Sequence, residues 1–235
     1  MIMYFSSPLS SLFQLSRRLF AEIPATRRGG MRRCRPLWFA VVVFLGCLVP
    51  APSRAGDYLA DLKERTALIS SVQGEFVQET LIPMFASPVK SKGRYVFRRP
   101  DSVRWEYTDP MREGVALQGE AGFRWEDNPA NRRAFTVRTD PLAGIIARQL
   151  VTWITFDAER IGGEYAIEQV AEEPLRLKMT PLRADIRSVI EAITIAFRVD
   201  GTASLVEIAE RQGGKTSIIF AEPVVNGSVD DREFE

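Results

Sequence analysis

Aromatic and polar or charged side chains alternate within residues 95–107, and this pattern constrains the fold more than any other feature of the chain. Ser102, Arg104 and Glu106 occupy one parity. The other parity is apolar or aromatic within each run: Tyr95 and Phe97, then Val103, Trp105 and Tyr107. Because successive side chains of a strand point to opposite faces, these strands have one aromatic and one charged face. Such a sheet either covers a core or lines an apolar concave surface.

Similar strand-like segments recur along the chain and are joined by short turns rich in Gly, Pro, Asp and Asn, among them Gly162-Gly163. Between two apolar runs, the pair Asp200-Gly201 predicts a hairpin. Eleven strands are expected, at residues 73–80, 89–98, 102–108, 113–119, 121–127, 132–138, 164–170, 174–180, 189–198, 203–211 and 214–221. Short strands joined by hairpin turns indicate an antiparallel sheet, and a twisted sheet of this size curls. The expected fold class is therefore mainly β, with a single curved antiparallel sheet.

Two helices are expected beside this sheet. Asp57 can cap a helix that runs to residue 71 and has its apolar side chains near one face. A second helix is expected over residues 141–153, with Asp140 as its cap and a proline at its first position. Its apolar side comprises Leu142, Ile145, Ile146 and Leu150. Both helices are free to cover the concave face of the sheet.

The N-terminal part has the pattern of a secretory leader. Residues 37–49 carry no charge, follow three arginines and precede small residues that end at Ala55. This order predicts a signal peptide over residues 31–55, and hence a periplasmic protein. The alternative is a transmembrane anchor, although a bilayer span needs about 20 apolar residues. Since the basic region begins directly after a methionine, residues 1–30 are expected to be a mis-assigned start, and residues 56–235 the folded domain.

Lipidation at Cys47 is a further alternative, because Leu45-Gly46-Cys47 resembles the end of a lipobox. The only other cysteine is Cys34, so both cysteines lie within the expected leader. The part that remains after cleavage then has no disulfide and no thiol chemistry.

Composition excludes several classes of function. Residues 1–55 hold eight of the 31 basic residues and one of the 30 acidic residues, so the remainder has a net charge of −6. This charge argues against nucleic acid as a partner. The chain has no histidine, which removes the usual catalytic triads and the commonest metal ligand. We therefore expect no catalytic residues, no metal site, no cofactor and no enzymatic activity.

The aromatic parity supplies the candidate binding surface. Its members are Phe76, Tyr95, Phe97, Val103, Trp105, Tyr107, Phe123 and Trp125. Ordinary core packing is one interpretation of this set. The other is a cavity for acyl chains, since burying each methylene contributes roughly 0.8 kcal/mol.

Several segments, in this order, resemble the periplasmic outer-membrane lipoprotein carrier family, or LolA type. They are Ser71-Val-Gln-Gly-Glu-Phe-Val-Gln78, Ser91-Lys-Gly-Arg-Tyr-Val-Phe-Arg-Arg-Pro100, Val103-Arg-Trp-Glu-Tyr107 and Leu175-Arg-Leu-Lys-Met-Thr-Pro181. The resemblance covers roughly residues 58–234. It implies an unclosed half-barrel whose hydrophobic cavity lies under a helical lid, here residues 57–71 and 141–153.

The resemblance also implies roles for single residues and partners. Arg99 takes the position of the arginine that bonds to the lid and holds the empty cavity closed. Val103 and Trp105 take positions in the cavity wall, and Val103 is smaller than the aromatic residue that the best-known members of the family have there. The implied cargo is the acyl chains of a lipoprotein, accepted from an inner-membrane transporter and passed to an outer-membrane receptor by a monomer. A carrier of another lipid or glycolipid, and a lipid-sensing or docking module, remain alternatives.

Overall fold

The computed structural model describes residues 57–85, 87–140, 151–152, 156 and 158–235. Twelve strands form one antiparallel sheet in the order β6-β5-β4-β3-β2-β1-β11-β10-β9-β8-β7, with β12 paired to β1. They are β1 Ser71–Leu81, β2 Val89–Arg98, β3 Ser102–Asp109, β4 Glu113–Gln118, β5 Ala121–Glu126, β6 Arg133–Thr136, β7 Tyr165–Ala171, β8 Arg176–Pro181, β9 Ile190–Phe197, β10 Ala203–Glu210, β11 Lys215–Phe220 and β12 Val224–Val225. In the described part of the chain β6 and β7 are the two edges, so the sheet is not closed into a barrel. All eleven expected strands are confirmed, and within the described residues the short β12 is the one addition.

The helices agree less well with expectation. The first, α2 Asp57–Ala67, ends four residues before the expected boundary, because Ser71 already pairs with Arg98 in the sheet. Residues 151–152 of the second expected helix are helical, and its residues 141–150 and 153 lie outside the described residues. Two short helices, α4 Ala158–Glu164 and α5 Ala184–Val189, were not predicted. The pair Gly162-Gly163 was interpreted as a turn, but the structure places it inside α4. None of the helices in the described ranges is long and apolar enough to span a membrane.

The predicted hairpin at Asp200-Gly201 is present between β9 and β10. The Asp200 carboxylate accepts hydrogen bonds from the backbone and hydroxyl of Thr202, at 2.8 and 2.6 Å. Gly201 has a φ of +86°, in the left-handed region that glycine adopts without strain. Local turn chemistry therefore fixes this connection.

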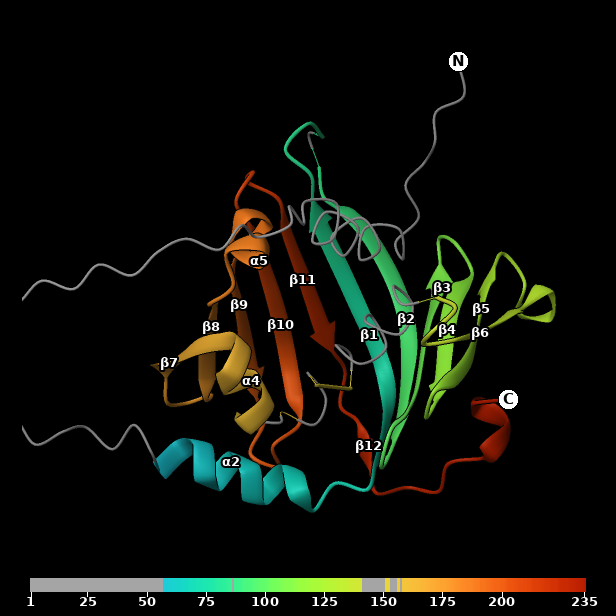
Figure 1. Ribbon diagram of the computed structural model, residues 1–235, viewed down its shortest axis with the longest axis horizontal. Coiled ribbons are helices and arrows are strands. Elements are labelled where there is room, and N and C mark those ends of the chain that lie inside the picture. Colours follow the sequence, from blue (N-terminus) through green and yellow to red (C-terminus); the bar gives the residue numbers. More distant parts are fainter. Residues whose placement is uncertain (1–56, 86, 141–150, 153–155, 157) are drawn as a thin grey trace, which may run out of the picture.

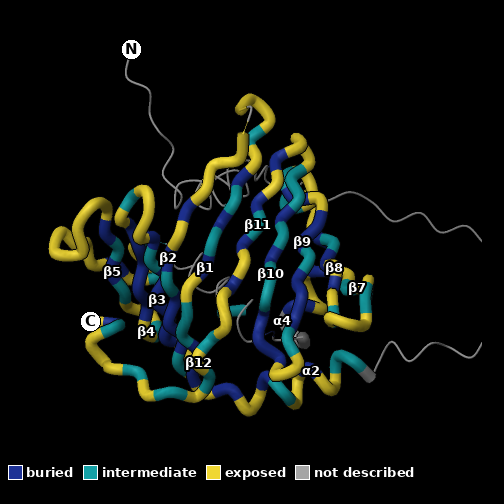
Figure 2. The backbone as a smooth tube through the Cα atoms, turned by 180° about the vertical axis from the view of Figure 1, so that it is seen from behind, coloured by how far each residue is buried: buried dark blue, intermediate teal, exposed yellow. Residues whose placement is uncertain are grey.

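The two faces of the sheet differ in what they contact. The inner face, which carries Phe76 and Trp105, belongs to one large apolar cluster that also includes Leu62 of α2 and Ile161 of α4. Figure 1 shows α2 crossing one end of the strands and α4 lying in front of the sheet. The outer face is turned toward the viewer in Figure 2, where buried and exposed residues alternate along several strands. The main core therefore lies on the inner face, between sheet and helices.

Candidate functional site

Six of the eight expected cavity residues lie together on the inner face. Phe76, Tyr95, Phe97, Val103, Trp105 and Tyr107 belong to one cluster, and none is more than 2% exposed. Cross-strand pairing brings them together, because Tyr95 is opposite Trp105 and Phe97 is opposite Val103. The Phe76 and Trp105 rings stack with their centroids 4.0 Å apart. The Phe76 ring also covers Gly93, where a Cβ would lie only 2.4 Å from the ring.

The other two, Phe123 and Trp125, lie on the outer face in a separate small cluster with Ala116. The register explains this, because Phe123 is opposite Ala116, and Ala116 is opposite Arg104 rather than Trp105. The Arg104 guanidinium lies 4.6 Å from the centroid of the Trp125 ring. These two aromatic residues therefore do not share a surface with the other six.

The second half of the sheet contributes apolar side chains that the sequence analysis did not select. Strands β8 to β11 supply buried side chains to the same cluster: Leu177, Met179, Ile193, Ile195, Val206, Ile208, Ile218 and Phe220. Phe220 packs edge-on against Tyr95, with the centroids 5.1 Å apart. The alternation within residues 203–211 and 214–221 was the available signal. The inner face is thus aromatic on β1 to β3 and mainly aliphatic on β8 to β11.

Arg99 joins the β2–β3 turn to the C-terminal end of α2. Its Nε donates to the Ile69 carbonyl oxygen at 2.6 Å, and its Nη2 donates to that of Thr66 at 2.8 Å. Its backbone N–H donates to the Ser70 carbonyl at 2.8 Å. The last carbonyls of a helix have no partner within the helix, and a guanidinium can satisfy several of them at once. Arg99 therefore bonds to the C-terminal end of α2.

A second turn holds the same end of α2. The Arg65 guanidinium donates from Nη1 to the Val199 carbonyl at 2.5 Å, in the turn between β9 and β10. In that turn Gly201 lies close to the helix, since a Cβ there would come within 3.1 Å of Arg65 Cβ and 3.3 Å of Thr66 Cγ2. The end of α2 is therefore held by turns from both halves of the sheet. The other expected lid residues, Leu142, Ile145, Ile146 and Leu150, lie outside the described residues.

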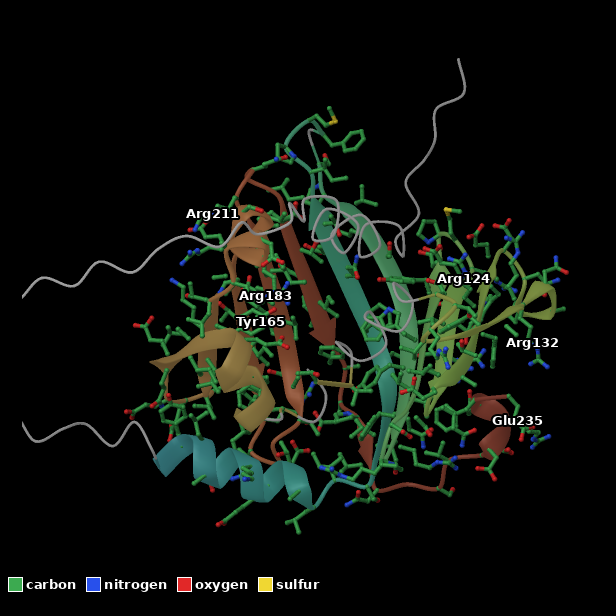
Figure 3. All side chains as sticks on the ribbon, viewed as in Figure 1. Arg124, Arg132, Tyr165, Arg183, Arg211 and Glu235 are labelled. Atoms are coloured by element: carbon green, nitrogen blue, oxygen red, sulfur yellow. The ribbon has the colours of Figure 1, made fainter. Side chains whose placement is uncertain are left out.

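The C-terminal segment after β12 is bound to the outer face by charge pairs. The Arg94 guanidinium donates to both Glu233 carboxylate oxygens, at 3.1 and 3.0 Å, and Arg98 donates to Asp231 at 2.6 Å. Burial lowers the pKa of Arg94, but its hydrogen bond to Glu233 and the nearby carboxylates outweigh burial, so the pKa is raised. At the last residue the Glu235 carbonyl accepts from Arg132 at 2.5 Å, and both residues are labelled in Figure 3. This segment is therefore held by arginines of the outer face and by Arg132.

A family profile described as "Outer membrane lipoprotein carrier protein LolA" matches residues 67–235. The chain belongs to the LolA family. Its relatives include the outer-membrane lipoprotein carrier protein of Halorhodospira halophila, which is 25% identical over 83% of this chain and 88% of its own length. The protein of the same name from Alkalilimnicola ehrlichii is 28% identical over 64% of this chain and 68% of its own length.

Two solved structures resemble the LolA-family fold seen here. A chain of the Pseudomonas aeruginosa MucA/MucB complex matches 76% of this chain and 59% of its own length, at 16% identity and a TM-score of 0.46. A LolA superfamily protein of Nitrosomonas europaea matches 75% of this chain and 95% of its own length, at 11% identity and a TM-score of 0.42. The family assignment does not depend on them.

The LolA family consists of carriers, not enzymes, so the relevant property of the site is what it can bind. Within the described ranges, no three His, Cys, Asp or Glu side chains are grouped so that they could hold a metal ion. What the geometry provides is a wide apolar face and a helix whose end is fixed by a few hydrogen bonds.

Proposed function

We propose that this protein is a periplasmic carrier that binds the acyl chains of lipoproteins on its inner face. The proposal rests on one observation, a continuous apolar surface that shares a cluster with the aliphatic side chains of β8 to β11. Its members are Phe76, Tyr95, Phe97, Val103, Trp105 and Tyr107. Apolar groups bound there leave water without forming covalent bonds, and each buried methylene contributes roughly 0.8 kcal/mol. Binding and release then need no cofactor and no reaction.

The proposed transfer uses α2 as part of a lid. The hydrogen bonds from Arg99 to Thr66 and Ile69 hold the helix end against the β2–β3 turn while the inner face is empty. Such bonds are weak enough for an acyl chain to displace, because each bond to a charged donor contributes about 1.5–3 kcal/mol, and less at a partly exposed site. The monomer would accept its cargo from an inner-membrane transporter and deliver it to an outer-membrane receptor.

Native mass spectrometry of the protein purified from a bacterial periplasm tests this proposal. Spectra taken before and after organic extraction should differ by the mass of an acylated ligand, and fragmentation should identify a lipoprotein acyl group. A different lipid in the fragments would keep the carrier function and change the cargo. An empty protein that also takes up no fluorescent fatty-acid probe would contradict the proposal and favour a docking module. The measured mass also locates the N-terminus, and so tests cleavage after Ala55 and lipidation at Cys47.

A further inference from the structure

The inner face is not apolar along its whole length. A band of polar side chains crosses five adjacent strands, β11, β1, β2, β3 and β4. We call it the polar band: Gln78, Thr80, Ser91, Tyr107, Glu113 and Thr216. Every member is buried, with no more than 8% of its surface exposed. Burying this many polar groups costs free energy unless each of them forms hydrogen bonds.

Strand pairing makes the band continuous. Thr80 lies opposite Thr216, Gln78 opposite Ser91, and Tyr107 opposite Glu113. Because paired residues share a face, all six lie on the same side of the sheet as Phe76. The strands that carry them are neighbours in the sheet. The band is therefore one feature rather than six separate polar positions.

Hydrogen bonds connect part of the band. The Tyr107 hydroxyl donates to Gln78 Oε1 at 2.7 Å, and Gln78 Nε2 donates to Thr80 Oγ1 at 3.2 Å. Thr216 Oγ1 donates to Thr80 Oγ1 at the longer distance of 3.5 Å. Burial raises the pKa of the Tyr107 hydroxyl, so this group keeps its proton and remains a donor. The connected part of the band is uncharged and contains both donors and acceptors.

An unsatisfied donor lies where the band meets the aromatic surface. The indole N–H of Trp105 is buried and makes no hydrogen bond of normal geometry within the described part of the chain. It lies toward the Tyr107 hydroxyl: burial raises the pKa of that hydroxyl, and the nearby indole N–H lowers it by less. A buried N–H without a partner costs about 1–3 kcal/mol, which an acceptor on a ligand would recover. This donor therefore points to a ligand with an oxygen acceptor at this level of the inner face.

The band also has a defined position relative to α2. Along β1, Val72 lies at the α2 end, and Gln78 is six residues further, roughly 20 Å away. Between them the inner face is apolar, with Phe76 as its central aromatic residue. A ligand that follows the strands would have hydrocarbon near α2 and polar atoms at the band.

We propose that the polar band binds the uncharged ester or amide groups at the head of acyl chains whose hydrocarbon lies on the aromatic surface. This inference rests on the proposed function. A carbonyl oxygen of such a group accepts from the Trp105 N–H, the Gln78 amide or a threonine hydroxyl. A free fatty-acid carboxylate is disfavoured, because none of the six members of the band is basic and burying a charge without an opposite partner costs free energy. The band thus selects neutral acyl heads over both anions and plain hydrocarbon.

Competition against a bound fluorescent alkyl probe tests this selection with three ligands of equal chain length: monopalmitoylglycerol, palmitate and hexadecane. The ester should bind at least about tenfold more tightly than either of the others. Gln78→Leu, and separately Thr216→Val, should each weaken the ester about three- to tenfold and leave hexadecane unchanged. Thr108→Val is the matched control, since Thr108 is exposed on the outer face beside Tyr107.

The outcomes separate the two proposals. Equal affinity for all three ligands, unaltered in folded Thr216→Val protein, would overturn the polar-band inference and leave the carrier function standing. Failure of the wild-type protein to bind the alkyl probe at all would contradict the carrier function itself. Circular dichroism of each variant establishes that it is folded, and Thr216→Val removes a long hydrogen bond, the one to Thr80 at 3.5 Å.

Discussion

Replacing Arg99 with leucine should release the end of α2 without disturbing the apolar inner face. The substitution removes the two side-chain hydrogen bonds, at 2.6 and 2.8 Å, and leaves the carbonyls of Thr66 and Ile69 without those donors. Bonds to a charged donor contribute about 1.5–3 kcal/mol each, and partial exposure of this site reduces that value. We expect a loss of about 2–4 kcal/mol between α2 and the β2–β3 turn.

This loss has a measurable size in local opening. Since 1.4 kcal/mol corresponds to a factor of ten, the population with α2 released should rise roughly 30- to 700-fold. Amide hydrogen exchange in residues 62–69 should accelerate by a similar factor, while exchange in β9 and β10 stays near the wild-type rate. Uptake of a fluorescent acyl probe should also become faster, because less free energy is needed to displace the helix.

Arg98→Leu is the matched control. Arg98 is the neighbouring arginine, but it pairs with Asp231 of the C-terminal segment on the outer face. It should alter neither exchange in α2 nor probe uptake. If Arg99→Leu leaves amide exchange in α2 and probe uptake at wild-type values, these hydrogen bonds do not hold the helix, and the role proposed for Arg99 is wrong.

Three further perturbations test other parts of the structure. Gly93→Ala places a Cβ 2.3 Å from a backbone oxygen, so Tm should fall by roughly 5–10 °C in calorimetry, whereas Gly163→Ala, with no atom within 4 Å, should not lower it. Burial raises the pKa of Tyr95 and Tyr165 to about 12, while tyrosine in the unfolded chain ionises near pH 10. The free energy of unfolding should therefore fall as pH rises from 10 toward 12. An unchanged urea midpoint between pH 9 and 11 would contradict this. Phe234→Ala removes a buried side chain from the C-terminal segment, which should then be digested by carboxypeptidase about tenfold faster, with the inner-face binding of an alkyl probe retained.

The strands could be predicted because the signal for a half-buried strand is local. Val103, Trp105 and Tyr107 alternate with polar residues, and that period alone places them on one face. The register between strands is not local, and it decides which faces of different strands coincide. Phe123 and Trp125 were grouped with Trp105 for lack of that register. The pairing of Arg104 with Ala116, and of Ala116 with Phe123, puts them on the other side.

The alternation within a single strand already predicted part of the polar band. Gln78 and Thr80 have the same parity as Phe76, so the sequence already placed polar groups on the aromatic face of β1. Their continuation on β2, β3, β4 and β11 depends on register and became visible only in the sheet. The short helices could not be predicted for another reason. Gly162-Gly163 has a low intrinsic preference for helix, so its position in α4 depends on tertiary contacts such as that of the buried Ile161.

The hydrogen bonds from Arg99 to the end of α2 and the polar band lie at opposite ends of β1. This separation predicts how the effects of substitutions at the two places combine. Arg99→Leu should change the rate of uptake for every acyl probe, because it acts on the helix rather than on the ligand. Gln78→Leu should change equilibrium affinity only for ligands with an ester or amide head. Sites this far apart, with no shared contact, usually contribute additively within about 0.5 kcal/mol. The double variant should therefore show the fast uptake of one and the weak ester binding of the other. A coupling energy well above that limit would mean that the head group and α2 act on each other through the ligand-binding face, and that the acyl chain does not lie along β1 as proposed.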